Sequence, residues 1–235
     1  MAPSIKGSLP LLKNASLSSA NKKAPSFHGP TQVVTFKIGP NLTEFVVHKE
    51  FACYYSPVLK AAFESEFIEG RTQTYTLDDT TEDAFRLLVQ WLYSQRLTSE
   101  LRDESSGKPY DGIDKQTQRK TIEAETKILV SLWVLVEKLL LPSLQNDAMG
   151  AIIWFAEQLD LLDFHVNTAV YAQTAPGSQL RRVFVDLCAY RLGTESIVQF
   201  QVNFSKEMLL DILVAKDEKP PLPMVASNYY VPVPL

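Results

Sequence analysis

Cysteine and histidine are scarce in this chain of 235 residues, which holds two cysteines and three histidines. Cys53 and Cys188 lie far apart and neither belongs to a CxxC pair, so their spacing predicts no disulfide framework and no zinc site. A nucleophilic triad needs a base within hydrogen-bond reach of its nucleophile. His28 lies in a low-complexity leader, and we expect structural roles for His48 and His165. We therefore predict no catalytic residue, no metal site and no cofactor.

The sequence also lacks a long apolar run and a glycine-rich phosphate loop. The longest apolar stretch, residues 128–136, contains Ser131 and ends at Glu137, which makes it too short to span a bilayer. Residues 1–23 contain no continuous apolar segment of the kind found in signal peptides. The nine glycines are dispersed, and none is followed by Lys-Ser or Lys-Thr. We expect an intracellular protein, in the cytoplasm or the nucleus, with no membrane partner.

A strong excess of one charge is missing as well. The formal net charge is −4, and the lysines and arginines form no cluster larger than short pairs. Because a nucleic-acid interface needs a basic face, we expect no direct contact with nucleic acid. Hydrophobic residues make up 46% of the chain and charged residues 21%, which is typical of a globular protein.

Composition divides the chain into four regions. Residues 1–30 are rich in Ser, Pro, Ala and Lys and predict a flexible leader. Residues 31–160 carry the patterns of strands and helices and predict a folded domain, interrupted by a polar loop at 98–121. Residues 161–217 predict a helical extension, and five prolines predict an extended tail over 218–235.

Three short strands are expected in the first half of the domain. VVTFKIG at 33–39 and EFVVH at 44–48 are rich in β-branched and aromatic residues, and the turn sequence between them predicts a hairpin. Helical spacing begins after His48, and Ser56-Pro57 predicts two short helices, with Ser56 as the cap of the second. A glycine-containing turn and a third strand at 74–77 follow.

Apolar residues at helical spacing predict the longer helices. Asp79–Thr81 offers caps for a helix with one buried face, and residues 128–140 are apolar nearly all round, which is typical of a central buried helix. The predicted buried face consists of Ala84, Leu87, Leu88, Trp91 and Leu92. The other helices are expected at 122–140, 143–158, 179–192 and 205–214.

The order of these patterns resembles that of a BTB/POZ domain. VVTFKIGPNLTEFVVHKEFACYYSPVLKAAF is similar to the first half of the family, in which a strand ending at His48-Lys49 runs into helices marked by Ser56-Pro57 and Phe63. FIEGRTQTYTLDDTTEDAFRLLVQWLYSQRL is similar to its third strand and following helix. LVSLWVLVEKLLLPSLQNDAM resembles the helical hairpin that completes the domain, and GSQLRRVFVDLCAY resembles the helical extension of many fungal members. The resemblance covers about Gln32 to Ala156.

The resemblance implies an α/β fold of the α+β type, with a small β-sheet capped by a cluster of α-helices and followed by an all-helical extension. Residues 31–160 would form the BTB/POZ domain. It further implies a non-enzymatic protein–protein interaction module that forms homodimers and recruits partners. Narrower alternatives are a substrate adaptor of a cullin-3 ubiquitin ligase and a transcriptional regulator that acts through BTB-mediated assembly. An enzyme with an unrecognised site near His165 is the alternative from another class.

Four residues are candidates for the partner surface. Lys49 matches a basic position that many dimeric members pair with an acidic residue, although the acidic position falls on Gln32. Tyr93, Arg96 and Leu97 end the predicted amphipathic helix, and Tyr and Arg are favoured at interface hot spots. The polar loop follows Leu97 directly, in the region that family members use for cullin contacts, so we expect that surface to be altered.

Overall fold

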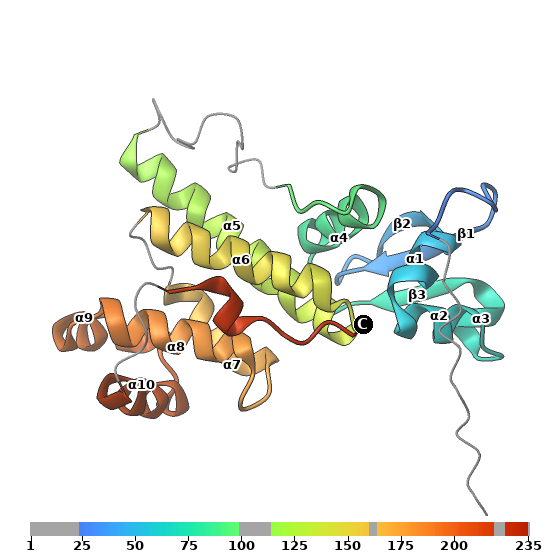
Figure 1. The fold of residues 1–235 in the computed structure, drawn as a ribbon. Coiled ribbons are helices and arrows are strands. Elements are labelled where there is room, and N and C mark those ends of the chain that lie inside the picture. Colours follow the sequence, from blue (N-terminus) through green and yellow to red (C-terminus); the bar gives the residue numbers. More distant parts are fainter. Residues whose placement is uncertain (1–23, 99–113, 160–163, 219–223, 235) are drawn as a thin grey trace, which may run out of the picture.

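The computed structural model places a small sheet with short helices at one end of the molecule and a stack of longer helices at the other (Figure 1). No helix within the described residues is long and apolar enough to cross a membrane. The described segments are 24–98, 114–159, 164–218 and 224–234.

A three-stranded sheet forms the first part of the structure. β1 (Val33–Ile38) lies in the centre and pairs antiparallel with β2 (Thr43–His48) and parallel with β3 (Thr74–Leu77). The predicted hairpin and third strand are therefore confirmed. Because side chains alternate along a strand, the even-numbered residues of β1 are buried in the core and the odd-numbered residues lie toward the surface.

Two short helices, α1 (Lys49–Tyr55) and α2 (Pro57–Phe63), follow the hairpin and meet at Ser56. The Ser56 hydroxyl accepts a hydrogen bond from the backbone N–H of Leu59 at 3.1 Å, which confirms the predicted cap. The same hydroxyl donates to the carbonyl of Leu139 at 2.7 Å. Since Ser56 is fully buried, it connects the α1–α2 corner to a segment 83 residues later in the chain.

The segment before β3 differs from the predicted glycine turn, because Ile68–Thr72 form a short helix, α3. A Cβ atom at Gly70 would lie 1.8 Å from the carbonyl oxygen of Ser65, so a side chain there would clash with the backbone. The helix ends at Gln73 in left-handed backbone, with φ of 50°. The glycine therefore marks the close approach of two backbone segments and not a turn.

α4 (Glu82–Ser94) begins after its cap Thr81 and packs on the sheet. The predicted buried face is confirmed except at Leu87, which is only partly buried. Phe85 is fully buried, and its ring centroid lies 4.9 Å from that of Phe36. Contact with the aromatic residues of the sheet therefore decides which side of α4 is buried.

The predicted loop at 98–121 is wrong in its last part. α5 (Lys115–Lys138) begins before Ile122, and the carboxylate of Asp114 caps it by accepting two backbone N–H bonds of the first turn, both at 3.0 Å. The first two turns are mostly exposed, which explains their polar composition. Residues 99–113 of the predicted loop lie outside the described residues.

The second half of α5 is buried on nearly all sides, as predicted. α6 (Pro142–Leu159) lies alongside it after a short connection in which Leu140 has φ of 54° (Figure 1). Pro142 occupies the first position of α6, where its missing N–H breaks no helical hydrogen bond. The buried residues of this half of α5 are Leu129, Val130, Leu132, Trp133, Val134, Leu135 and Val136.

The C-terminal part of the chain forms a second layer of helices beside α6 (Figure 1). A continuous cluster of buried apolar residues runs from the sheet through α5 and α6 into this layer. The predicted boundary between domain and extension at residue 160 falls outside the described residues. The elements of the layer are η1 (Phe164–Val166), α7 (Asn167–Gln173), α8 (Gln179–Arg191), α9 (Thr194–Gln199), η2 (Gln201–Asn203), α10 (Lys206–Glu218) and η3 (Ala226–Tyr229).

Residues 224–234 of the predicted extended tail pack against the helices, and Ala226–Tyr229 within them form the short helix η3. Tyr229 in η3 is 1% exposed, and its hydroxyl donates to the carboxylate of Asp186 at 2.8 Å. The side-chain amide of Asn146 accepts from the backbone N–H of Val231 at 2.8 Å and donates to its carbonyl at 3.0 Å. A buried tyrosine and polar partners on two helices therefore hold this segment against the fold.

Candidate partner-binding surfaces

Lys49 lies at the start of α1, beside the first strand. Its backbone N–H donates to the carbonyl of Gln32 at 2.9 Å, so the two positions singled out by the resemblance are neighbours. The Lys49 ammonium donates to the carbonyl of Phe63 at 3.0 Å, at the C-terminal end of α2, where a cation is favoured by the partial negative charge of the last carbonyls. Glu50 and Glu64 line the same shallow hollow of about 320 Å³. Lys49 thus contributes to the α1–α2 corner as well as to the surface.

Tyr93, in the last turn of α4, is the centre of an aromatic cluster that we call the aromatic corner, formed with Phe27, His48 and Phe51. The ring centroids of Tyr93 and Phe51 lie 4.7 Å apart. The Tyr93 hydroxyl accepts from the backbone N–H of His48 at 3.0 Å and lies 2.8 Å from its Nδ1. Tyr93 therefore fixes the junction of β2 and α1 and remains 39% exposed.

The end of the predicted flexible leader is held against this corner. The carboxylate of Glu50 accepts hydrogen bonds from the backbone N–H of Ser26 at 2.8 Å and of His28 at 2.9 Å. These bonds, first that of Ser26, lower the pKa of the Glu50 carboxyl. The prediction of a flexible leader over 1–30 is therefore wrong for residues 24–30, because α1 supplies a partner for their backbone; residues 1–23 lie outside the described residues.

Arg96 and Leu97 follow the left-handed cap of α4 and line a cavity of about 590 Å³, which we call the junction cavity. Its other side is formed by Trp154 of α6 and Tyr230 of the tail. Asp147, also in the lining, accepts from the indole N–H of Trp91 at 3.0 Å, which ties α6 to α4. The other lining residues are Gln95, Gly150 and Ala226.

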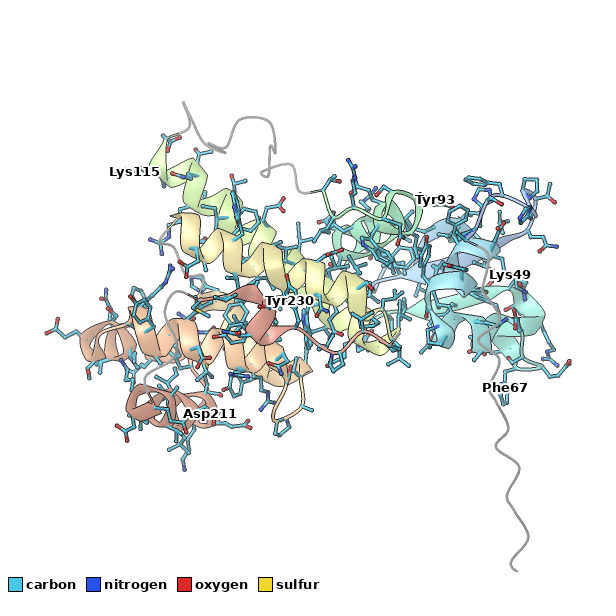
Figure 2. The ribbon with its side chains drawn as sticks, in the orientation of Figure 1. Lys49, Phe67, Tyr93, Lys115, Asp211 and Tyr230 are labelled. Atoms are coloured by element: carbon cyan, nitrogen blue, oxygen red, sulfur yellow. The ribbon has the colours of Figure 1, made fainter. Side chains whose placement is uncertain are left out.

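The four predicted residues thus fall on two surfaces and not on one. Lys49 and Tyr93 lie on the side of the molecule that carries the sheet, and Tyr230 of the junction cavity lies over the helical part (Figure 2). Arg96 and Leu97 face α6 and the tail. Local sequence patterns give no sign of this cavity, because its walls come from segments at least 50 residues apart in the chain.

Phe67 and Ile68 form an exposed apolar pair that the sequence analysis missed. Phe67 is 76% exposed and Ile68 is 57% exposed, at the start of α3 (Figure 2). The backbone N–H of Phe67 donates to the hydroxyl of Ser65 at 3.2 Å, so the backbone at the pair is held. Two large apolar residues between acidic neighbours are the signal in the sequence, but the glycine that follows them predicts a turn.

The described residues contain no group of three or more His, Cys, Asp and Glu side chains that could hold a metal ion. Cys53 and Cys188 are both buried free thiols. Burial raises the pKa of the Cys188 thiol to about 12, which keeps it protonated and unreactive near neutral pH.

A comparison with known families identifies the part of the chain around the sheet. Residues 32–108 match the family model of the BTB/POZ domain. The match includes all three strands and helices α1 to α4, and it stops before α5. A search of curated proteins finds no match to the chain. Residues 32–108 therefore form a BTB/POZ domain, and domains of this family are protein–protein interaction modules.

Proposed function

We propose that this protein is an intracellular, non-enzymatic interaction module that forms a homodimer through its BTB/POZ domain and recruits a second protein. The exposed pair Phe67–Ile68 carries the recruitment part of this proposal. Large apolar side chains that are exposed next to each other are typical of interaction sites. Aromatic residues contribute much of the binding energy when a partner buries them.

The backbone around the pair is preorganised, which favours binding. The Ser65 hydroxyl accepts from the N–H of Phe67 and donates to the carbonyl of Ala62 at 2.8 Å, so it ties the start of α3 to the end of α2. Gly70 allows α3 to pack directly on the backbone of Ser65. A partner therefore meets a segment that is already ordered and loses less conformational entropy on binding.

The outer face of the sheet supports the homodimer part of the proposal. Val46 of β2 is 62% exposed and Val33 of β1 is 43% exposed, on the side away from the core. β2 is also an edge strand, so one row of its backbone groups faces away from β1. Edge strands with exposed apolar side chains are prone to pair with another chain.

Recruitment is tested by affinity purification with the variant Phe67→Ser/Ile68→Ser. We expect the variant to lose the proteins that the native chain retains, because both exposed apolar side chains are removed without any change in the core. Val202→Ser is the matched control, since Val202 is 86% exposed but lies in η2 of the extension. Retention of the same proteins by the double variant would rule out the pair as the recruiting site.

Dimerisation is tested separately by size-exclusion chromatography with light scattering. We expect twice the chain mass for the native protein and for Phe67→Ser/Ile68→Ser, and a lower mass for Val46→Glu, which places a charge on the outer face of the sheet. A monomer of the native protein at micromolar concentration contradicts the homodimer.

An adaptor of a cullin-3 ubiquitin ligase is the second candidate function. An adaptor needs two separate binding surfaces, and the structure carries the Phe67–Ile68 pair on the BTB/POZ domain and the junction cavity between that domain and α6. We expect cullin-3 to be captured by the native chain and not by Phe67→Ser/Ile68→Ser. Absence of binding to the native chain in a pull-down with purified cullin-3 would end this candidate.

A further inference from the structure

α10, at the end of the molecule far from the sheet, has one buried face and one open face (Figure 1). The buried face packs against α8 and consists of Met208, Ile212 and Ala215. The open face carries large apolar side chains: Leu210 is 55% exposed, Leu213 is 62% exposed and Val214 is 58% exposed. An amphipathic helix of a globular protein is expected to be polar on its outer face, so this outer face needs a partner.

Three charged residues of α10 are already engaged inside the molecule. Glu207 accepts from the guanidinium of Arg181 at 2.7 Å, and Asp211 accepts from the hydroxyl of Tyr171 at 2.6 Å. The ammonium of Lys216 donates to the carbonyl of Leu192 at 2.8 Å at the end of α8. Each of these three side chains therefore already has a partner within the chain, although Glu207 and Asp211 remain exposed.

Lys206 and Asp217 are exposed and lie on the same side of α10 as its apolar stripe. With about 100° between successive residues, Lys206, Leu210, Leu213 and Asp217 fall on one line along the helix. Their spacing of four, three and four residues is that of the contact positions in a coiled coil. The line thus has a positive charge at its first end, two leucines in the middle and a negative charge at its last end.

This pattern is self-complementary. We propose that α10 binds α10 of a second copy of this chain, in antiparallel orientation about a two-fold axis. In that arrangement Lys206 lies opposite Asp217 of the second copy, and Leu210 lies opposite its Leu213. Each charged pair then joins a positive and a negative side chain, and the leucines of both copies are covered. A two-fold contact uses the same patch on both copies, which is what a self-complementary line requires.

The size of the contact sets its strength. A helix of 13 residues is about 20 Å long, so two such helices bury less than the ~1,200 Å² of a stable specific interface. The α10 contact is therefore weak and depends on protein concentration. Because α10 and Phe67 lie at opposite ends of the molecule, the contact leaves the surfaces of the BTB/POZ domain open (Figure 2). It can add to an interface at the sheet and join smaller assemblies into larger ones.

The test measures the weight-average mass of the full chain over a concentration series by analytical ultracentrifugation. Lys206→Glu and Asp217→Lys each turn two attractive charge pairs into two repulsive ones. We expect each variant to lower the association constant of the concentration-dependent step about tenfold or more. The double variant Lys206→Glu/Asp217→Lys restores opposite charges across the axis, and we expect near-native association. Lys127→Glu, an exposed position on α5, has the same charge change as Lys206→Glu and should leave association unchanged.

The outcomes separate this contact from dimerisation through the sheet. Leu210→Ser/Leu213→Ser removes only the α10 step, whereas Val46→Glu acts on the sheet step and leaves the α10 step in place. Equal mass curves for the native chain and the single charge reversals overturn the proposal. Failure of the double reversal to restore association also overturns it, because the antiparallel pairing requires that rescue. Circular dichroism confirms that each variant is folded.

Discussion

At the scale of single residues, buried polar side chains connect elements that are distant in the chain. The Ser56 hydroxyl caps α2 through Leu59 and also donates to the carbonyl of Leu139 after α5. The indole of Trp91 in α4 donates to Asp147 in α6 in the same manner. A buried carbonyl that loses its donor is left unsatisfied, at a cost of about 1–3 kcal/mol.

We expect Ser56→Ala to lower the free energy of unfolding by about 2–4 kcal/mol, since it removes a helix cap worth about 1 kcal/mol and leaves the carbonyl of Leu139 without this donor. Ser178→Ala is the matched control, because Ser178 caps α8 through the N–H of Leu180. That control should lose only about 1 kcal/mol. Urea unfolding measures both, and equal losses contradict the role of Ser56 as a connection.

The lowered pKa of the Glu50 carboxyl predicts that the docking of residues 24–30 depends on pH. Its folded-state pKa is lowered, chiefly by the hydrogen bond from the N–H of Ser26, so the docked state is stabilised above the ordinary carboxyl pKa of 4.5. The stabilisation is lost as the pH falls through the lowered, folded-state pKa. We expect the amides of Ser26 and His28 to be protected from hydrogen exchange at pH 7 and to lose that protection in acid. In Glu50→Ala both amides should be unprotected at every pH, whereas Glu44→Ala should change nothing.

At the scale of elements, tertiary contacts decide the conformation of one segment and the placement of another. α3 contains Gly70 inside a helix because the backbone of Ser65 lies against it. Residues 224–234 contain two prolines yet dock on α6 and α8, through Asn146 and through the Tyr229–Asp186 bond. In both segments a tertiary contact supplies what the local sequence does not specify.

We expect Tyr229→Phe to lower the free energy of unfolding by about 1.5–3 kcal/mol, because it removes a hydrogen bond to the buried carboxylate of Asp186. Tyr230→Phe is the neighbouring control; Tyr230 is 42% exposed, so its loss should stay within about 0.5 kcal/mol. Thermal unfolding followed by circular dichroism measures both variants. A Tyr229→Phe protein as stable as the native one would show that the tail does not hold the helical layer.

At the scale of the whole molecule, the BTB/POZ domain and the helical layer share one continuous apolar core. Arg181 supports the outer part of that layer from a nearly buried position. Its guanidinium donates to the hydroxyl of Thr174 at 3.0 Å and to the carbonyl of Tyr171 at 2.8 Å, and it pairs with Glu207. A shared core predicts that the described parts unfold together.

We expect Arg181→Met to lower the free energy of unfolding by about 3–5 kcal/mol, because its removal leaves buried acceptors without their donor. The unfolding should remain a single transition, with the same midpoint by tryptophan fluorescence and by far-ultraviolet circular dichroism. Arg182→Met is the control, since the side chain of Arg182 is 53% exposed. Two separate transitions in the native chain contradict the shared core.

The sequence by itself determined the elements whose information is local. β-Branched and aromatic residues predicted β1 and β2, Ser56-Pro57 divided α1 from α2, and the apolar run at 128–140 predicted the buried part of α5. Composition, a Ser-Pro pair and helical spacing are all local features of the chain, so they can be found without knowledge of the tertiary contacts. The order of the elements was enough for the BTB/POZ resemblance, which the family match over 32–108 confirms.

Only the tertiary structure decided what the chain presents to a partner. Arg96 and Leu97 line a cavity because α6 and the tail lie opposite them, and residues 24–30 are ordered because Glu50 binds their backbone. The tail docks through contacts such as Asn146–Val231, which are 85 residues apart. No local period encodes such a contact, because it depends on where distant elements meet and on which polar groups would otherwise stay unsatisfied.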